Sequence, residues 1–388
     1  MKNAPSVYKQ SFWVLSLTVA LTSCSDKNME PPSEALSRAA DVHSNDRVIT
    51  AAAKIDALLN SQELGILGGP VNLFDTETEL LERSAIAASN TLLTEVNPGE
   101  RNPYYGDLHV HTAYSFDGYA FGTLASPYDA YRFAKGEAIK NPGGYDMQLT
   151  EPMDFYAVTD HGMFLGLAKA AAETNTEFSK HKFSEPYHDL NAPDNFGTGV
   201  FNRFKRLLTF SDFIPTAVSG IFGQELDRQE VLDITRSAWA DTIDAADQFN
   251  DPGRFTTFAA YEYTSSTTNM GNLHRNVIFR TTETLPREPF SRMHSNNPED
   301  LWDWMDELRS KGVESLAIPH NSNGSNGQMF KSVDWSGTPF DNSYAQQRSR
   351  NEPIVEITQI KGTSETHPTL STRDELAGFE ITPYRVAT

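Results

Sequence analysis

Residues 106–112, with the sequence GDLHVHT, carry two histidines two positions apart in a stretch that is typical of a short strand. Residues two apart on a β-strand point to the same side, so the imidazoles of His109 and His111 can reach one metal ion. Taken alone, the pair is equally compatible with two ordinary surface or core histidines. The hypothesis of a metal site therefore depends on the residues that accompany the pair.

Short apolar runs of the same kind recur along the chain, at 154–160, 255–264, 315–320 and 354–360. Each run is bounded by turn residues, as buried parallel strands are. Helical patterns lie between several of them, at 126–140, 235–250 and 298–311. This alternation predicts an α/β fold.

Ionisable residues stand at or near the ends of these runs: Asp117, His161, Glu262, His274 and His320. Together with His109 and His111, five of the ten histidines occupy such positions. Reactive side chains at the carboxyl ends of successive strands are typical of the active face of a (β/α) barrel. An open doubly wound sheet is the alternative, although it concentrates function at one switch point.

The composition indicates a folded, acidic protein. Of 388 residues, 38% are hydrophobic, which predicts a sizeable core, and the formal net charge is -20. Such a surface repels a phosphate backbone, so we expect no nucleic-acid partner. A small anionic substrate stays compatible with this charge, because bound metal cations reverse the local field.

The first 23 residues are interpreted as a signal peptide. Lys2 and Lys9 precede an apolar stretch, 11–20, that is too short to span a bilayer comfortably. The segment 21–24, LTSC, resembles a bacterial lipobox, in which the cysteine is lipidated. Cys24, the only cysteine, would then anchor an exported lipoprotein to the outer membrane, on its periplasmic face. A chance cysteine after an ordinary signal peptide is the alternative.

The remaining chain divides into three parts. Residues 24–46 are polar and are interpreted as a tether. Residues 47–98 form an N-terminal extension with helical patterns at 51–59 and 78–87, expected to pack on the main domain. Residues 99–388 form the main domain, with an insertion at about 163–251. Insertions of that size above an active face usually shape the substrate pocket.

Five segments together resemble the polymerase-and-histidinol-phosphatase (PHP) superfamily and, more narrowly, the bacterial domain of unknown function numbered 3604. They are GDLHVHTAYSFDG, AVTDHG, AAYEYT, GNLHRN and IPHNSN, and the resemblance covers roughly residues 100–388. It implies a distorted seven-stranded (β/α) barrel that holds two or three divalent metal ions. It also implies metal ligands at His109, His111, Asp117, His161, Glu262, His274 and His320, with Glu262 bridging two ions.

The sequence departs from the superfamily pattern near its end. The superfamily takes its last ligands from an Asp-x-His on the final strand, and none follows Glu356. Residues 365–367, Glu-Thr-His, are one substitute, but they follow the preceding run too closely for another helix and strand. The other hypothesis is a partial family member whose barrel is incomplete at the C-terminus.

The resemblance implies hydrolysis of phosphate-type or related esters by a metal-bound hydroxide, with zinc, manganese or iron as the ion. Arg275 and Lys361 are candidates for gripping an anionic group, with ordinary surface charge as the alternative. His43, His181, His188 and His294 are expected to lie outside the site. The rival hypotheses are a catalytically impaired metal-binding lipoprotein and an amidohydrolase-type barrel enzyme. A serine hydrolase is disfavoured, since no Gly-x-Ser-x-Gly motif is present.

Overall fold

The computed structural model describes residues 78–83, 102–192, 200–266, 271–359 and 362–364, together with Phe74 and six single residues after 367. The signal peptide, the tether, Cys24, the helical pattern at 51–59, Lys361 and residues 365–367 lie outside the described residues. No described helix has the length and apolar character that a membrane crossing requires.

The first sheet is parallel, as the sequence predicts. Strand β5 (Phe155–Val158) lies between β2 (Gly106–Val110) and β6 (Thr256–Phe258) and pairs in parallel with both. The crossover helices are α5 (Pro127–Ala134) and α8 (Arg228–Phe249), and both pack against β5. This is the βαβ arrangement expected from alternating strands and helices.

Helix α5 is shorter than the predicted helix over 126–140. It begins at a capping box in which Ser126 and Asp129 satisfy each other's backbone amides. It ends before Gly136, whose φ of 86° lies in the left-handed region. The rest of the predicted helix instead enters a hairpin of β3 (Ile139–Lys140) and β4 (Asp146–Met147).

The second sheet is antiparallel, which corrects the prediction of parallel strands for 315–320 and for the second half of the run 255–264, whose first half is the parallel strand β6. Strand β8 (Arg275–Phe279), not predicted as a strand, lies between β7 (Ala260–Tyr263) and β10 (Ser315–Pro319). Residues 264–274 between β7 and β8 are too few for the crossover that a parallel neighbour needs, so the chain turns straight back.

The two sheets meet where β6 leads into β7. A parallel bridge between His161 and Glu262 continues the first sheet into the second. The two sheets also share an apolar cluster formed by Leu108, Ala157, Ala260, Ile278 and Ile318. Nevertheless, none of the sheets within the described ranges closes into a barrel, and the structure is mixed α/β.

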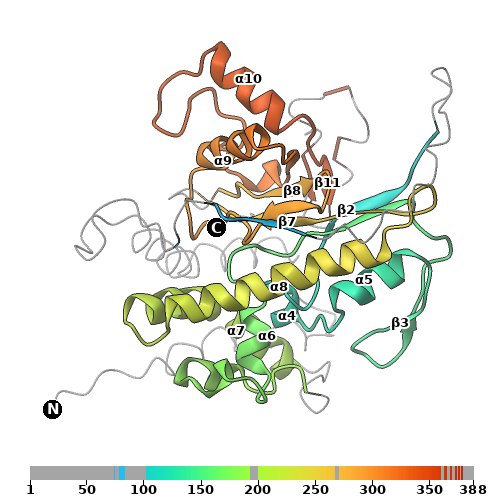
Figure 1. Ribbon diagram of the computed structural model, residues 1–388, viewed down its shortest axis with the longest axis vertical. Helices are drawn as coiled ribbons and strands as arrows, with labels where there is room; N and C mark the ends of the chain where they lie inside the picture. The colour runs from blue at the N-terminus through green and yellow to red at the C-terminus, as the bar shows by residue number, and fades with distance from the viewer. Residues whose placement is uncertain are drawn as a thin grey trace, which may run out of the picture.

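Helices cover the strands on two sides. In Figure 1, the strands lie between α5 and α8 on one side and α9 (Pro298–Ser310) and α10 (Asn342–Asn351) on the other. The run 354–360 is not the expected strand along its length. Of its described residues, 354–359, only Thr358–Gln359 form a strand, β11, paired with β12 (Gly362–Thr363).

The insertion forms a helical layer beside the first sheet. It contains α6 (Leu167–Ala172), the 3-10 turns η2 (Phe178–Lys180) and η3 (Lys182–Tyr187), and α7 (Val200–Phe222). Because α8 is a crossover helix of the scaffold, the inserted part ends near 227 rather than at 251. The short helix α4 (Phe116–Phe121) packs against α7 and connects this layer to the His-x-His strand.

The described residues of the N-terminal extension, Phe74 and 78–83, pack on the main domain, and part of them forms a strand. Residues Leu80–Glu82 form β1, antiparallel to β9 (Thr284–Pro286), so the predicted helix over 78–87 is wrong there. Trp304 Nε1 donates to Thr78 Oγ1 at 2.6 Å, and Phe74 is buried against His294. Backbone hydrogen bonds from β9 thus override a weak local helical preference.

Candidate metal centre

The fold brings together all seven ligands that the family resemblance implies. His109 and His111 lie on β2, His161 lies just beyond β5, and Asp117 lies on α4. Glu262 lies on β7, while His274 immediately precedes β8 and His320 immediately follows β10. The five imidazoles are packed ring against ring, with neighbouring centroids 4.1 to 5.9 Å apart.

Glu262 stands at the centre of this cluster and is 1% exposed. Its Oε1 lies 2.6 Å from His274 Nδ1 and 3.0 Å from His320 Nε2. Its Oε2 faces the remaining three imidazoles, at 3.1 Å from His111 Nε2, 3.4 Å from His161 Nδ1 and 3.7 Å from His109 Nε2. Each carboxylate oxygen therefore serves a different group of histidines, as a bridging carboxylate would.

The carboxylates of the cluster attract positive charge. Burial alone would raise the pKa of Glu262, but the imidazoles of His161 and His320 hold that pKa well below its usual range. Burial alone would lower the pKa of His109, but Glu262 and Glu356 raise it to about 9. The pKa of His111 is raised as well, but burial outweighs Glu262 at His274 and His320 and lowers their pKa values, that of His274 to about 4.

A second carboxylate, Asp117, lies on the insertion side of the cluster. Its Oδ2 is 3.3 Å from His161 Nε2, and its Oδ1 is 3.5 Å from His111 Nδ1. Burial would raise the pKa of Asp117, but the imidazole of His161 holds it far below its usual range. The carboxylate is therefore ionised and available to a cation.

Hydroxyl groups fix the orientation of two ligand rings. Ser115 Oγ donates to Asp117 Oδ1 at 2.5 Å, so it uses its single proton there. It can then only accept from His111 Nδ1, which lies 2.9 Å away, and this leaves the lone pair of His111 on Nε2. His161 Nδ1 is within hydrogen-bond distance of a second hydroxyl, Thr264 Oγ1.

The end of strand β5 is held by Asp160, which precedes His161 and is 1% exposed. Its Oδ1 accepts from the backbone amide of Thr112, and its Oδ2 accepts from the hydroxyl of Thr112, both at 2.5 Å. Burial raises the pKa of Asp160 to about 6. These bonds join the end of β5 to the residue that follows the His-x-His pair.

The donor set fits divalent cations. Four trios place one ligand atom of each member within 4.8 Å of the others: His109–His111–Glu262, His109–His320–Glu356, His111–Asp117–His161 and His161–Glu262–His274. Glu262 Oε2 and His320 Nδ1 are also buried without a hydrogen-bond partner, as an ion-binding atom is before the ion binds. Imidazole and carboxylate without thiolate suit zinc, manganese or iron.

Glu356 is the residue of these trios that the sequence did not identify as a ligand candidate. Its backbone amide donates to Pro319 O at 3.0 Å, which holds it beside the end of β10. Its Oε2 lies 2.7 Å from His109 Nδ1. The visible signal was a carboxylate within the apolar run 354–360, but its spacing matched none of the recognised motifs.

Arg275, a candidate for gripping an anionic group, lies elsewhere. It is 2% exposed, and its Nε donates to the buried Glu352 at 2.6 Å. Neighbouring residues on a strand point to opposite faces, so Arg275 points away from the site that His274 enters. Its role is a buried ion pair, which corrects the prediction.

The histidines expected outside the site do lie outside it where they are described. His181 pairs with Glu230 at 2.8 Å, and His188 contacts Ser179 O at 2.8 Å. His294 is more buried than expected for a polar loop, since it packs between Phe74 and Phe290.

A cavity of about 670 Å³ opens onto the cluster. His109, His111, Asp117 and Glu356 face it on one side, and its apolar wall includes Leu108, Phe121, Phe155 and Ile318. No lysine or arginine lines it among the residues that the structure describes. A bound anion would therefore depend on metal ions for its neutralisation.

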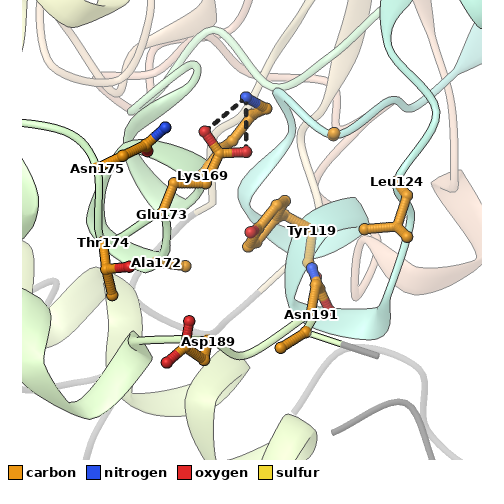
Figure 2. A pocket seen from close by; sticks show the side chains of 11 residues that line it. Tyr119, Leu124, Lys169, Ala172, Glu173, Thr174, Asn175, Asp189 and Asn191 are labelled. Atoms are coloured by element: carbon orange, nitrogen blue, oxygen red, sulfur yellow. Dashed lines mark hydrogen bonds and ion pairs between the residues drawn. The ribbon is translucent and has the colours of Figure 1, made fainter. Parts of the chain in front are cut away.

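Figure 2 shows a second cavity, of about 420 Å³, which contains none of the clustered ligands. It is bounded by the Lys169–Glu173 ion pair, Tyr119 and Asp189. Tyr119 and Asp117 are two residues apart on α4, so they project from nearly opposite faces of that helix. Of these two cavities, the one at the histidine cluster is therefore the one that the candidate metal ligands line.

A sequence model of the family described as a protein of unknown function, DUF3604, matches residues 98–387. The chain belongs to this family. The DUF3604 region contains Glu356 and all seven candidate ligands, and it begins at residue 98, the last residue of the predicted N-terminal extension. Neither a curated protein nor a solved structure matches the chain.

Proposed function

We propose that this protein is a metal-dependent hydrolase of phosphate-type or related esters, with a site for two or three divalent ions. The observation that carries the proposal is the position of Glu262, whose two buried oxygens face two separate groups of imidazoles. Such a carboxylate can hold two ions close together, as hydrolytic two-metal sites require.

The metal ions would come from zinc, manganese or iron, and when bound they would activate water and stabilise charge on a substrate oxygen. The chain itself does the positioning. His109, His111 and Glu262 would hold one ion, and His111, Asp117 and His161 would hold another. His274 and His320 both lie against Glu262 Oε1 and would contribute from that side. The PHP-type barrel is part of this proposal, and the shared core of the two sheets supports it.

The cavity lining bears on the substrate. Phosphate, sulfate and carboxylate esters all present an oxygen that a cation can hold. Because the described lining lacks a basic side chain, substrate charge would be neutralised by the ions, and the apolar wall would contact the organic part of the ester.

The test is hydrolysis of a panel of chromogenic phosphate, sulfate and carboxylate esters by metal-depleted protein, before and after addition of manganese or zinc. We expect metal-stimulated turnover of at least one ester, and its loss in His111→Ala. His181→Ala is the matched control, because His181 is a partly exposed histidine paired with Glu230. Ion binding without turnover of any ester would favour the alternative, a metal-binding protein that has lost catalysis.

We further propose that the protein is exported and anchored through a lipid on Cys24. Support comes from the basic, apolar and small-residue segments that precede Cys24 in the sequence. Metabolic labelling with a fatty-acid analogue should label the wild-type protein and not Cys24→Ser. An unlabelled wild-type protein would contradict the anchor and leave the proposed chemistry untouched.

A further inference from the structure

The two nitrogens of His109 have different carboxylate neighbours. Nδ1 lies 2.7 Å from Glu356 Oε2, which is a hydrogen-bond distance. Nε2 faces Glu262 Oε2 at 3.7 Å, on the side of the ring where His111 also approaches. One ring nitrogen, Nδ1, is therefore hydrogen-bonded to Glu356, while the other, Nε2, faces Glu262.

His111 repeats this division with a different partner. Its Nδ1 is occupied by Ser115 Oγ at 2.9 Å, and its Nε2 lies 3.1 Å from Glu262 Oε2. Both histidines of the pair thus present Nε2 to one carboxylate oxygen, and that oxygen has no hydrogen-bond partner of its own. A metal-ligating histidine commonly donates its other ring N–H to such a partner.

Glu356 is held rigidly enough to orient a ring. Its backbone amide donates to Pro319 O at 3.0 Å, and its Oε1 accepts from Gln359 Nε2 at 2.7 Å. The side chain is 20% exposed. With its backbone and one oxygen fixed, the other oxygen is aimed at His109.

We infer that Glu356 is a positioning residue, which accepts the proton of His109 Nδ1 and so turns the lone pair of Nε2 toward Glu262 and a bound ion. The inference rests on the proposed function and adds a residue to it that no motif identified. Direct ligation of an ion by Glu356, in the trio with His109 and His320, is the alternative, and the experiment distinguishes the two.

The experiment compares wild-type protein, Glu356→Gln, Glu356→Ala and the control Asp107→Asn. Asp107 lines the same cavity, and Asp107→Asn removes the same negative charge as Glu356→Gln. However, Asp107 Oδ1 accepts from the backbone amide of His109 rather than from its ring. Zinc affinity is measured by chelator competition, ions per chain by elemental mass spectrometry, and folding by thermal melting.

We expect Glu356→Ala to weaken the affinity for zinc by about 10- to 100-fold, with the number of ions at saturation unchanged. Glu356→Gln should recover most of the affinity, because its amide oxygen still accepts from Nδ1, and Asp107→Asn should match wild type. Wild-type affinity in Glu356→Ala would overturn this inference and leave the proposed function unaffected. Loss of one ion per chain in both Glu356 variants, with unchanged melting, would overturn it in favour of direct ligation. A wild-type protein that takes up no zinc would overturn the inference together with the proposed function.

Discussion

Two regions of this molecule bury histidines among different neighbours, carboxylates in one region and aromatic rings in the other. In the cluster at the ends of the strands, five imidazoles surround Glu262, and the pKa of His109 rises to about 9. In the core behind β7, His294 packs between Phe74 and Phe290, and burial lowers its pKa to about 4. The same side chain is thus pushed toward charge at His109 and kept neutral at His294. Within the cluster, burial outweighs Glu262 at His274 and His320, and their pKa values are lowered as well.

The difference lies in the carboxylates. Buried carboxylates in the cluster stabilise positive charge, whether it is carried by protons or by metal ions, and no carboxylate is among the causes that shift the pKa of His294. Burial therefore does not by itself mark a functional histidine. A buried histidine that contacts an ionised, buried carboxylate does indicate a functional site. Mutations of the carboxylate or of the histidines test this difference.

The largest expected effect comes from Glu262→Gln. This change removes the charge that both groups of imidazoles face, so the affinity for metal should fall by more than the ~100-fold typical of losing an outer partner, at both groups together. Elemental analysis after saturation with zinc measures it. Glu314→Gln is the control, since Glu314 is a half-exposed carboxylate paired with Arg309. Retention of the wild-type ion count in Glu262→Gln would show that Glu262 is not the bridge.

A smaller effect is expected when only one side of Glu262 is disturbed. His111→Ala removes a ligand that faces Oε2, and His320→Ala removes one that faces Oε1. Each variant should lose about one ion per chain under conditions in which Glu262→Gln loses more, because the opposite group keeps its ligands. If either single variant lost every ion, the cluster would be one cooperative centre rather than two groups sharing a carboxylate.

That the seven candidate ligands lie together could be predicted from sequence, because most of them lie on or just beyond strands. His109 and His111 share a strand face, and His161 and His320 stand directly at strand ends, so short motifs preserve their geometry. Glu356 could not be predicted, because its approach to His109 depends on how the chain leaves β10. That path is set by tertiary packing rather than by spacing.

Errors in the fold prediction have the same origin. Strand β8 and the antiparallel second sheet follow from the short connection after β7, which periodicity does not encode. Leu80–Glu82 became a strand because β9 offered an edge to pair with. Arg275 was a candidate for gripping an anionic group, but the sequence does not fix where its side chain points, and in the structure it pairs with Glu352.

The smallest expected effect concerns His294, and it sharpens the contrast with the cluster. Its pKa in the folded protein is about 4, below the unfolded value of 6.5, so the unfolded chain binds more protons between these values. The stabilisation from keeping this ring neutral is complete above pH 6.5 and is lost as the pH falls toward 4. The full shift corresponds to about 3 kcal/mol.

His294→Gln should remove this acid sensitivity, since glutamine does not titrate. Urea unfolding of both proteins between pH 7.5 and 4.5 gives the free energy of unfolding at each pH, and the comparison of slopes cancels the other titrating groups. The wild-type slope should be steeper below pH 6.5, even if the variant is less stable throughout because the ring packing is lost. Parallel slopes would mean that protonated His294 is tolerated between Phe74 and Phe290, and burial among aromatic rings would then not separate the two kinds of histidine.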